Sequence, residues 1–285
     1  MRATPDNATL IGDRLDHPEC VCVGPDGTVY AGGEAGQIYR IDANGQRQIG
    51  STDGFVLGIA LDGLGRIHAC DIIHRAVFVI DRQGGVYRRS VGTPDHPFAV
   101  PNYAVFDRDG RMFVSDSGDY WAKPGTGRIF VIEPDGQTRL FHRGPFDFAN
   151  GLAIDPTDQW LYIVQSTAPD ICRIPLGRPD GPIEITHRLS ADTVPDGLAF
   201  SDDGQLLISC YKPDAVLIAR PDETVETYLE DPTGELLSRP TNVALFNGHL
   251  YTANIGGWQI VRIDTNLRPR GLYFPDNITN LIPAR

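Results

Sequence analysis

Short runs of alternating apolar and polar residues mark this chain, and one such run recurs six times. The copies read Glu-Cys-Val-Cys-Val-Gly from residue 19, Leu-Gly-Ile-Ala-Leu-Asp from 57, Asn-Tyr-Ala-Val-Phe-Asp from 102, Asn-Gly-Leu-Ala-Ile-Asp from 150, Asp-Gly-Leu-Ala-Phe-Ser from 196 and Asn-Val-Ala-Leu-Phe-Asn from 242. Their starts are 38, 45, 48, 46 and 46 residues apart. Repeats of about 40 to 50 residues built from short strands are typical of β-propeller blades. The pattern therefore predicts six blades.

Each copy continues through a turn into further strands. Asp-Gly pairs at 26–27, 109–110 and 203–204 lie between apolar runs, which indicates tight hairpins because both residues tolerate positive φ. Third strands are predicted over 37–42, 76–81, 128–133, 171–174, 216–219 and 259–264, and weaker outer strands over 47–49, 87–91, 138–141, 183–187, 226–229 and 271–274. The sequence thus predicts an all-β fold, a six-bladed β-propeller with four antiparallel strands per blade, forming a single domain over residues 1–285.

The repeat leaves open how the ring of blades closes. One possibility is that residues 8–12 pair with the last blade and complete it. The other is that a C-terminal strand at 272–274 already completes that blade.

Composition narrows the class of protein. An apolar fraction of 41% and a charged fraction of 22% fit a soluble globule, and no apolar run approaches the ~18 residues of a membrane span. The formal charge of −12 argues against a nucleic-acid partner, since phosphate binding needs clustered Lys and Arg. Five cysteines, an odd number, are expected to be buried and unpaired, and the N-terminus lacks the apolar core of a signal peptide. We therefore expect a cytoplasmic protein without a membrane partner; the oligomeric state is not indicated.

The first residue of the recurring run is polar in five of six copies. In a propeller these positions converge on one mouth of the central channel, so the five side chains become neighbours. Packing carboxylates and amides there is unfavourable unless something satisfies their oxygens, and Ca²⁺ accepts six to eight oxygen ligands. The alternative for each asparagine alone is that it begins a turn. Taken together, the set predicts a cation site; its members are Glu19, Asn102, Asn150, Asp196 and Asn242.

These residues give the chain a resemblance to the senescence-marker-protein, gluconolactonase and luciferin-regenerating-enzyme family of calcium-type propellers. The resemblance implies that Glu19, Asn150 and Asp196 hold one divalent cation, with Asn102 as a further ligand. Ca²⁺ is the expected ion, and Zn²⁺, Mn²⁺ and Fe²⁺ are alternatives. It also implies a metal-dependent lactonase or esterase, in which the cation polarises the carbonyl of a small-molecule lactone or ester. Asp196 would be the catalytic residue, as base or as nucleophile.

The sequence departs from the sugar-lactone members of this family at two positions. Those members often carry an arginine and an aspartate where this chain has Val100 and Tyr103. The change favours a substrate less polar than an aldonolactone. The residues expected to bind it are Asn102, Tyr103, His74, Trp121, Gln165, Tyr211, Asn242 and Trp258. Two alternatives are a non-catalytic ligand-binding propeller and a metal-free enzyme like strictosidine synthase.

Overall fold

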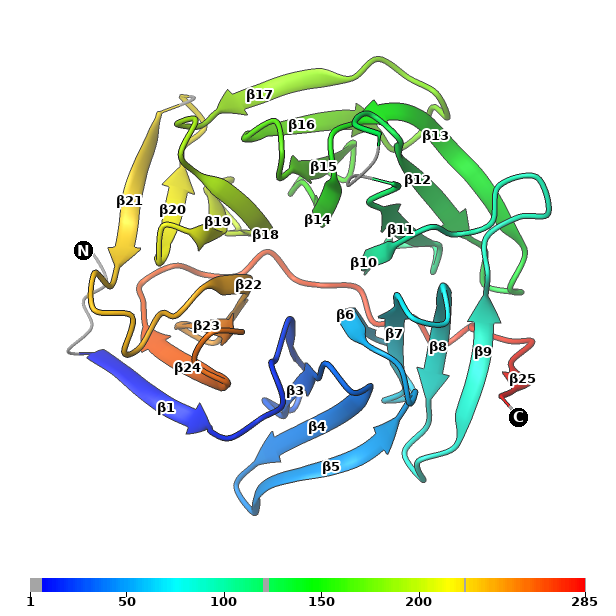
Figure 1. The fold of residues 1–285 in the computed structure, drawn as a ribbon, viewed down its shortest axis with the longest axis horizontal. Coiled ribbons are helices and arrows are strands. Elements are labelled where there is room, and N and C mark those ends of the chain that lie inside the picture. The colour runs from blue at the N-terminus through cyan, green and yellow to red at the C-terminus, as the bar shows by residue number, and fades with distance from the viewer. Residues whose placement is uncertain (1–6, 120–122, 223, 285) are drawn as a thin grey trace.

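The computed structural model describes residues 7–119, 123–222 and 224–284, and it forms six antiparallel sheets around one axis (Figure 1). The prediction of a six-bladed propeller is confirmed. Blade 1 comprises β2 (Val21–Val23), β3 (Val29–Gly32), β4 (Gln37–Asp42) and β5 (Gly45–Ser51). Blade 2 comprises β6 (Val56–Leu61), β7 (Ile67–Asp71), β8 (Ala76–Ile80) and β9 (Val86–Ser90). Blade 3 comprises β10 (Pro101–Phe106), β11 (Met112–Asp116), β12 (Gly127–Ile132) and β13 (Thr138–Phe146).

The other three blades repeat this order. Blade 4 comprises β14 (Ala149–Ile154), β15 (Trp160–Gln165), β16 (Asp170–Pro175) and β17 (Glu184–Arg188). Blade 5 comprises β18 (Val194–Phe200), β19 (Leu206–Lys212), β20 (Ala215–Ala219) and β21 (Val225–Glu230). Blade 6 comprises β22 (Pro240–Phe246), β23 (His249–Asn254), β24 (Gln259–Asp264) and β1 (Ala8–Gly12). The described residues contain no helix long and apolar enough to cross a membrane.

The hydrophobic core lies between neighbouring blades. Alternate side chains of each strand face one of the two adjacent sheets, so every pair of sheets encloses its own apolar layer. Between blades 3 and 4, for example, Phe113 and Ile163 belong to one buried cluster. All five cysteines are buried and free, as predicted. Because the inner strands are held from both sides, their first residues are placed firmly at the channel.

The ring is closed by the N-terminal strand. β1 pairs with β24, with Ala8 opposite Ile263 and Leu10 opposite Val261. Blade 6 therefore combines strands from both ends of the chain, which confirms the first of the two closures considered. The predicted outer strand at 271–274 is wrong, because β1 already occupies the edge of β24 that this strand would need.

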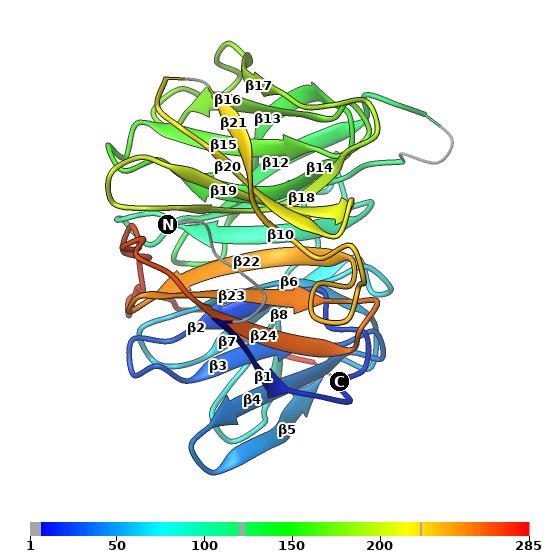
Figure 2. The same cartoon turned by 90° about the vertical axis from the view of Figure 1, so that its left-hand side faces the viewer.

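The residues after β24 instead form a segment, here called the strap (residues 265–281), that crosses the far end of the channel (Figures 1 and 2). It ends in β25 (Ile282–Pro283), which pairs with β9 of blade 2. The strap touches the ends of the inner strands. The five residues of the predicted cation site, here called the ring residues (Glu19, Asn102, Asn150, Asp196 and Asn242), lie at or just before the starts of these strands. The strap and the ring residues therefore occupy opposite mouths of the channel. Its backbone bonds include Arg270 N–H to Phe200 O at 3.0 Å, Gly63 N–H to Pro275 O at 2.7 Å and Thr279 N–H to Pro134 O at 2.9 Å.

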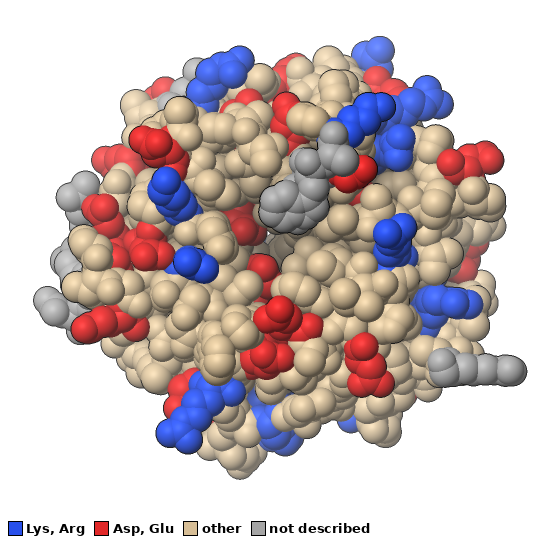
Figure 3. Space-filling view, viewed as in Figure 1, with Lys and Arg blue, Asp and Glu red and all other residues tan. Residues whose placement is uncertain are grey.

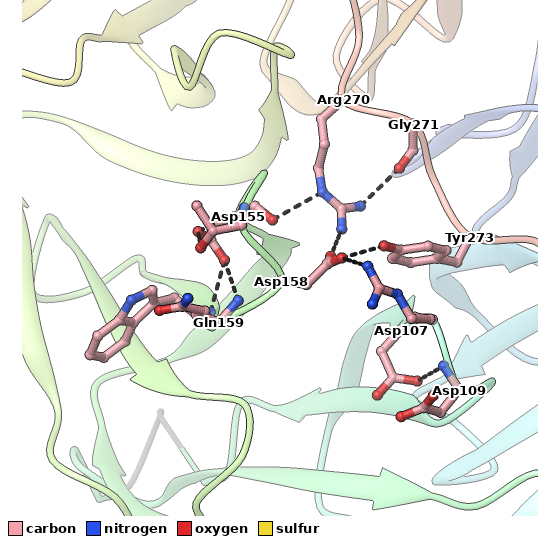
Figure 4. Close-up of polar contacts among 11 residues, drawn as sticks. Asp107, Asp109, Asp155, Asp158, Gln159, Arg270, Gly271 and Tyr273 are labelled. Carbon is pink, nitrogen blue, oxygen red and sulfur yellow. Dashed lines mark hydrogen bonds and ion pairs between the residues drawn. The ribbon is translucent and has the colours of Figure 1, made fainter.

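Asp158 is the main anchor of the strap (Figure 4). Its carboxylate accepts hydrogen bonds from the Arg270 guanidinium and the Tyr273 hydroxyl, and Arg108 approaches to 2.9 Å. Arg270 also donates from Nε to the Asp155 carbonyl at 3.1 Å. These charge-assisted bonds hold the Asp158 carboxylate ionised and its pKa below the ordinary value, although partial burial opposes this.

We predict that Arg270→Ala destabilises the protein by about 1–3 kcal/mol, because it removes charge-assisted bonds from a side chain that is only 9% exposed. Arg268→Ala is the matched control on the same strap. Its ion pair with Asp202 is 81% exposed on the arginine side, so its loss should change the free energy of unfolding by less than about 1 kcal/mol. Urea unfolding measures both; equal effects of the two substitutions would contradict the assignment of the anchor.

Candidate functional site

The predicted ring residues lie where the inner strands begin. Asn102, Asn150 and Asp196 belong to β10, β14 and β18, Asn242 belongs to β22, and Glu19 lies two residues before β2 of blade 1. In blades 2 to 6 the pairing of the inner strand with its neighbour is irregular at this position. A β-bulge bends a strand and re-aims its side chains. In these five blades the irregularity therefore accounts for how the first residue of the run is aimed at the channel.

Glycines beside the ring allow neighbouring inner strands to approach closely. A Cβ atom on Gly151 would lie 2.4 Å from the Asp196 carbonyl oxygen, and one on Gly58 would lie 2.5 Å from the Asn102 carbonyl oxygen. Gly197 is similarly close to the Cα of Asn242, at 2.8 Å. Since real Cβ atoms do not come this near to backbone, only glycine fits. This approach is what brings side chains of different blades together.

Two of the ring amides are anchored by an identical relay. Asn102 Nδ2 donates to Ser117 Oγ at 3.0 Å, and Ser117 Oγ donates to the carbonyl of Ala149 in the next blade at 2.9 Å. In blade 4, Asn150 Nδ2 donates to Ser166 Oγ at 3.0 Å, and this hydroxyl donates to Pro195 O at 2.7 Å. With Nδ2 fixed as the donor, the amide carbonyl oxygen is left as the group available to a ligand.

Glu19 and Asp196 are two half-buried carboxylates that act on each other electrostatically. Burial, and next the charge of Glu34, raise the pKa of Glu19 to about 7, against a hydrogen bond from Thr241. Burial, and next the charge of Glu19, raise the pKa of Asp196 well above its usual range, although a hydrogen bond from Asn150 opposes this. No neighbouring positive charge is sufficient to offset the effect of burial on the pKa of either carboxylate.

The rim of the channel mouth is negatively charged, as the Glu19 and Asp196 carboxylates are when ionised. Acidic side chains gather around the hollow at the middle of the face opposite the strap (Figure 3). Asp16, His17 and Glu34 form a group at this rim, with His17 Nδ1 3.0 Å from Asp16 Oδ1 and 2.8 Å from Glu34 Oε2. A negative mouth attracts cations and repels anions.

The donor set fits a hard divalent cation. Glu19 and Asp196 supply two carboxylates, and Asn102 and Asn150 supply amide oxygens, which are the ligand types that Ca²⁺ prefers. A dication would also remove the cost of ionising both carboxylates, the cost that the raised pKa values express. Oxygen donors alone do not select one hard ion.

Asn242 and Tyr103, both expected to bind substrate, are bonded to each other across the channel. The Tyr103 side chain is hydrogen-bonded to Asn242, which lies on the opposite blade, and Asn242 Oδ1 accepts a bond from the Val21 N–H at 3.3 Å. Burial raises the pKa of the Tyr103 phenol. The tyrosine thus crosses the channel at the level of the ring and ties blade 3 to blade 6. Below it, a cavity of about 70 Å³ lined almost wholly by apolar side chains extends to Leu272 and Phe274 of the strap.

The remaining predicted substrate residues occupy varied places. Tyr211 is exposed near the end of β19 in blade 5, and Trp258 is exposed in the turn between β23 and β24 of blade 6. Gln165 is buried and fully engaged, donating to Asp170 Oδ1 at 2.7 Å and accepting from the Asp147 N–H at 2.9 Å. His74 donates its backbone N–H to Asp71 Oδ1, its Nδ1 lies 3.2 Å from the same oxygen, and its ring packs against Phe78. Trp121 lies outside the described residues.

Sequence reasoning missed Thr241 and Ser166. A signal for the serine was present, because Ser117 and Ser166 follow Asn102 and Asn150 by 15 and 16 residues. Thr241 directly precedes Asn242 and reaches Glu19 only because the first and last blades meet. No pattern along the chain marks that contact.

Comparison with known proteins identifies the family. The model of the SMP-30/gluconolactonase/LRE-like region matches residues 33–249, so the chain belongs to this family of lactonase-type propellers. A second model, for the N-terminal region of strictosidine synthase-like proteins, matches residues 6–41. The family resemblance seen in the ring residues is thereby confirmed.

Individual relatives are distant. The lactonase drp35 of Staphylococcus haemolyticus is 21% identical over 195 residues, and the match spans 64% of this chain and only 59% of that protein. A gluconolactonase from Xanthomonas campestris superposes with a TM-score of 0.77 at 19% identity, over 91% of this chain and 89% of that one. A calcium-binding regucalcin of Agrobacterium tumefaciens gives 0.77 at 15% identity, over 93% and 95%. At these identities the structural likeness shows the fold.

We predict that Gly151→Ala lowers stability by about 1–3 kcal/mol and weakens Ca²⁺ binding, because the added Cβ meets backbone of blade 5 and displaces Asp196. Gly177→Ala is the control, since a Cβ there meets nothing within 4 Å. Unfolding by urea and calcium titration calorimetry measure the two effects. Unchanged calcium affinity in Gly151→Ala would refute the role given to the close approach.

The stability of the cation-free protein should fall as pH rises from about 5 to 7.5. Between the ordinary pKa of Glu19, 4.5, and its value of about 7 in the fold, the folded state binds more protons than the unfolded state. Carboxylates with lowered pKa, such as Asp231 at about 2, keep their full stabilising effect in this range.

Denaturation in the presence of chelator measures this slope. Glu19→Gln should flatten the slope, and saturating Ca²⁺ should restore the stability of the wild type at pH 7.5. An identical pH slope in wild type and Glu19→Gln would contradict the assignment.

Proposed function

We propose that this protein is a metal-dependent hydrolase of a lactone or ester. The observation that carries the proposal is the meeting of two carboxylates and two amide oxygens at one channel mouth, where burial raises the pKa of Glu19, and burial together with the charge of Glu19 raises the pKa of Asp196. A purely structural role does not account for this, because burying two like charges together lowers stability. The lactonase and gluconolactonase among its distant relatives support the same reaction class.

Glu19, Asn150 and Asp196 would hold the cation, with Asn102 beside them. The bound cation would supply Lewis-acid polarisation of the substrate carbonyl. Asp196 is the proposed general base, and its carboxylate takes the proton of the attacking water. Asn150 Nδ2 orients that carboxylate, and Ser166 in turn fixes Asn150 at 3.0 Å.

The substrate is proposed to be less polar than an aldonolactone. Tyr103 presents an aromatic ring at the level of the site, and its hydroxyl is bonded to Asn242. Val100, at the position where sugar-lactone relatives often carry an arginine, is apolar and half-buried, and its N–H is bonded to Asp116 Oδ1 at 3.0 Å. The acidic rim also favours neutral substrates over anionic ones, and it favours departure of the carboxylate product.

A second candidate is a metal-free enzyme in which Glu19 does the chemistry. The match of residues 6–41, which include Glu19, to strictosidine synthase-like proteins favours it. Asn150 and Asp196 argue for the hydrolase, because a metal-free site has no use for their converging oxygens. The two candidates differ in one simple respect, since only the hydrolase needs a divalent cation.

We predict that purified protein hydrolyses simple lactones or aryl esters with added Ca²⁺, Mn²⁺, Zn²⁺ or Fe²⁺, and loses this activity in chelator. Asp196→Asn should lower kcat by about 10²-fold or more while the fold remains intact, because an amide accepts no proton from water. Asp192→Asn, at an exposed position in the preceding loop, is the control. Turnover by Asp196→Asn within a few-fold of wild type would remove Asp196 from catalysis, and full activity in chelator would favour the second candidate.

A further inference from the structure

Trp258 has an unusual backbone conformation for a tryptophan. It lies in the turn between β23 and β24, immediately before the third strand of its blade, and its φ is 56°. The equivalent residues before β4 and β8 are Gly36, with φ 83°, and Arg75, with φ 51°. In these three blades the turn places its last residue in the left-handed region, which glycine enters without strain and a bulky residue does not.

Folding offers no reason for an indole at this position. Trp258 is 48% exposed, and none of the six hydrophobic clusters of the described residues includes it. A large apolar group that is both strained in its backbone and left in water reduces stability. Such a feature points to a role in binding.

The location of the ring supports that role. The indole packs against the imidazole of His17, with the ring centres 4.6 Å apart and the planes inclined by 59°. His17 also acts electrostatically on Glu19. The His17 side chain therefore lies between Trp258 and the Glu19 carboxylate of the candidate site. A bond from the Leu15 N–H to the Trp258 carbonyl, 3.0 Å long, fixes the turn against the N-terminal segment. The indole is thus held at the mouth, with much of its surface free.

We propose that Trp258 is a specificity-determining residue that binds a planar, uncharged, apolar group of the substrate while the reactive carbonyl lies at the carboxylate ring. The inference rests on the proposed hydrolase function and deepens it, because it names benzo-fused or aryl lactones as the substrate class. Flat apolar groups gain from an aromatic surface through area burial and ring contact. The acidic rim disfavours an anionic group at the same place.

The test compares two six-membered lactones, isochromanone, which carries a fused benzene ring, and δ-valerolactone, which does not. Trp258→Gly should lower kcat/KM for isochromanone by about fivefold to tenfold and change it less than about twofold for δ-valerolactone. Because glycine suits the turn, the melting temperature should stay equal or rise. Trp258→Phe, which keeps an aromatic ring, should retain most of the preference.

Arg75→Gly is the matched control, since it relieves the same turn conformation at an exposed position in blade 2. It should leave the ratio of the two kcat/KM values unchanged. An equal loss on both lactones, or a fall in melting temperature that accounts for the loss in Trp258→Gly, would overturn the inference while the hydrolase proposal stands. Hydrolysis of neither lactone by the wild type with any of the four cations would instead overturn the proposed function, and this inference with it.

Discussion

The close approach of six inner strands to one axis is the constraint on which the rest of the molecule depends. At Gly58, Gly151 and Gly197 the backbone of the next blade lies 2.5, 2.4 and 2.8 Å from where a Cβ atom would be, too close for any residue with a side chain. This spacing puts the first side chains of different blades into one small space. Burial then raises the pKa of Glu19, burial and the charge of Glu19 raise the pKa of Asp196, and the neighbouring carboxylate and amide oxygens fit the proposed divalent cation.

The two ends of the channel have different roles, because the strap at one end stabilises the fold and the mouth at the other end holds the candidate site. At the far end the strap is held by the Asp158 carboxylate, whose bonds to Arg270 and Tyr273 keep its pKa low. At the mouth, Glu19 and Asp196 are held in a state that resists ionisation. Tyr103 separates the two regions by crossing the channel to Asn242. Changes to the strap should therefore alter stability, and changes at the mouth should alter binding.

Several features that lower the stability of the fold lie together at the channel mouth. Two half-buried like charges and an exposed tryptophan with a positive φ each lower stability, and all three features lie within one or two side chains of each other. Elsewhere apolar layers fill the space between blades and Asp-Gly turns supply positive φ, although Phe148 and Asp158 also adopt positive φ. Unfavourable features that gather at one place, and are offset by a regular framework, are the pattern expected of a functional site.

The sequence by itself determined the blades and the ring residues, because strand alternation and a fixed repeat are local properties that read directly from residue order. It also indicated Glu19, Asn150 and Asp196 as partners, since equivalent positions of a closed ring must meet. Only the tertiary structure decided that β1 closes the ring and that residues 271–274 cross the channel as part of the strap. It alone revealed the contact of Thr241 with Glu19 and the link between Tyr103 and Asn242. These pairings join distant parts of the chain, and their geometry arises from ring closure, which leaves no periodic trace along the sequence.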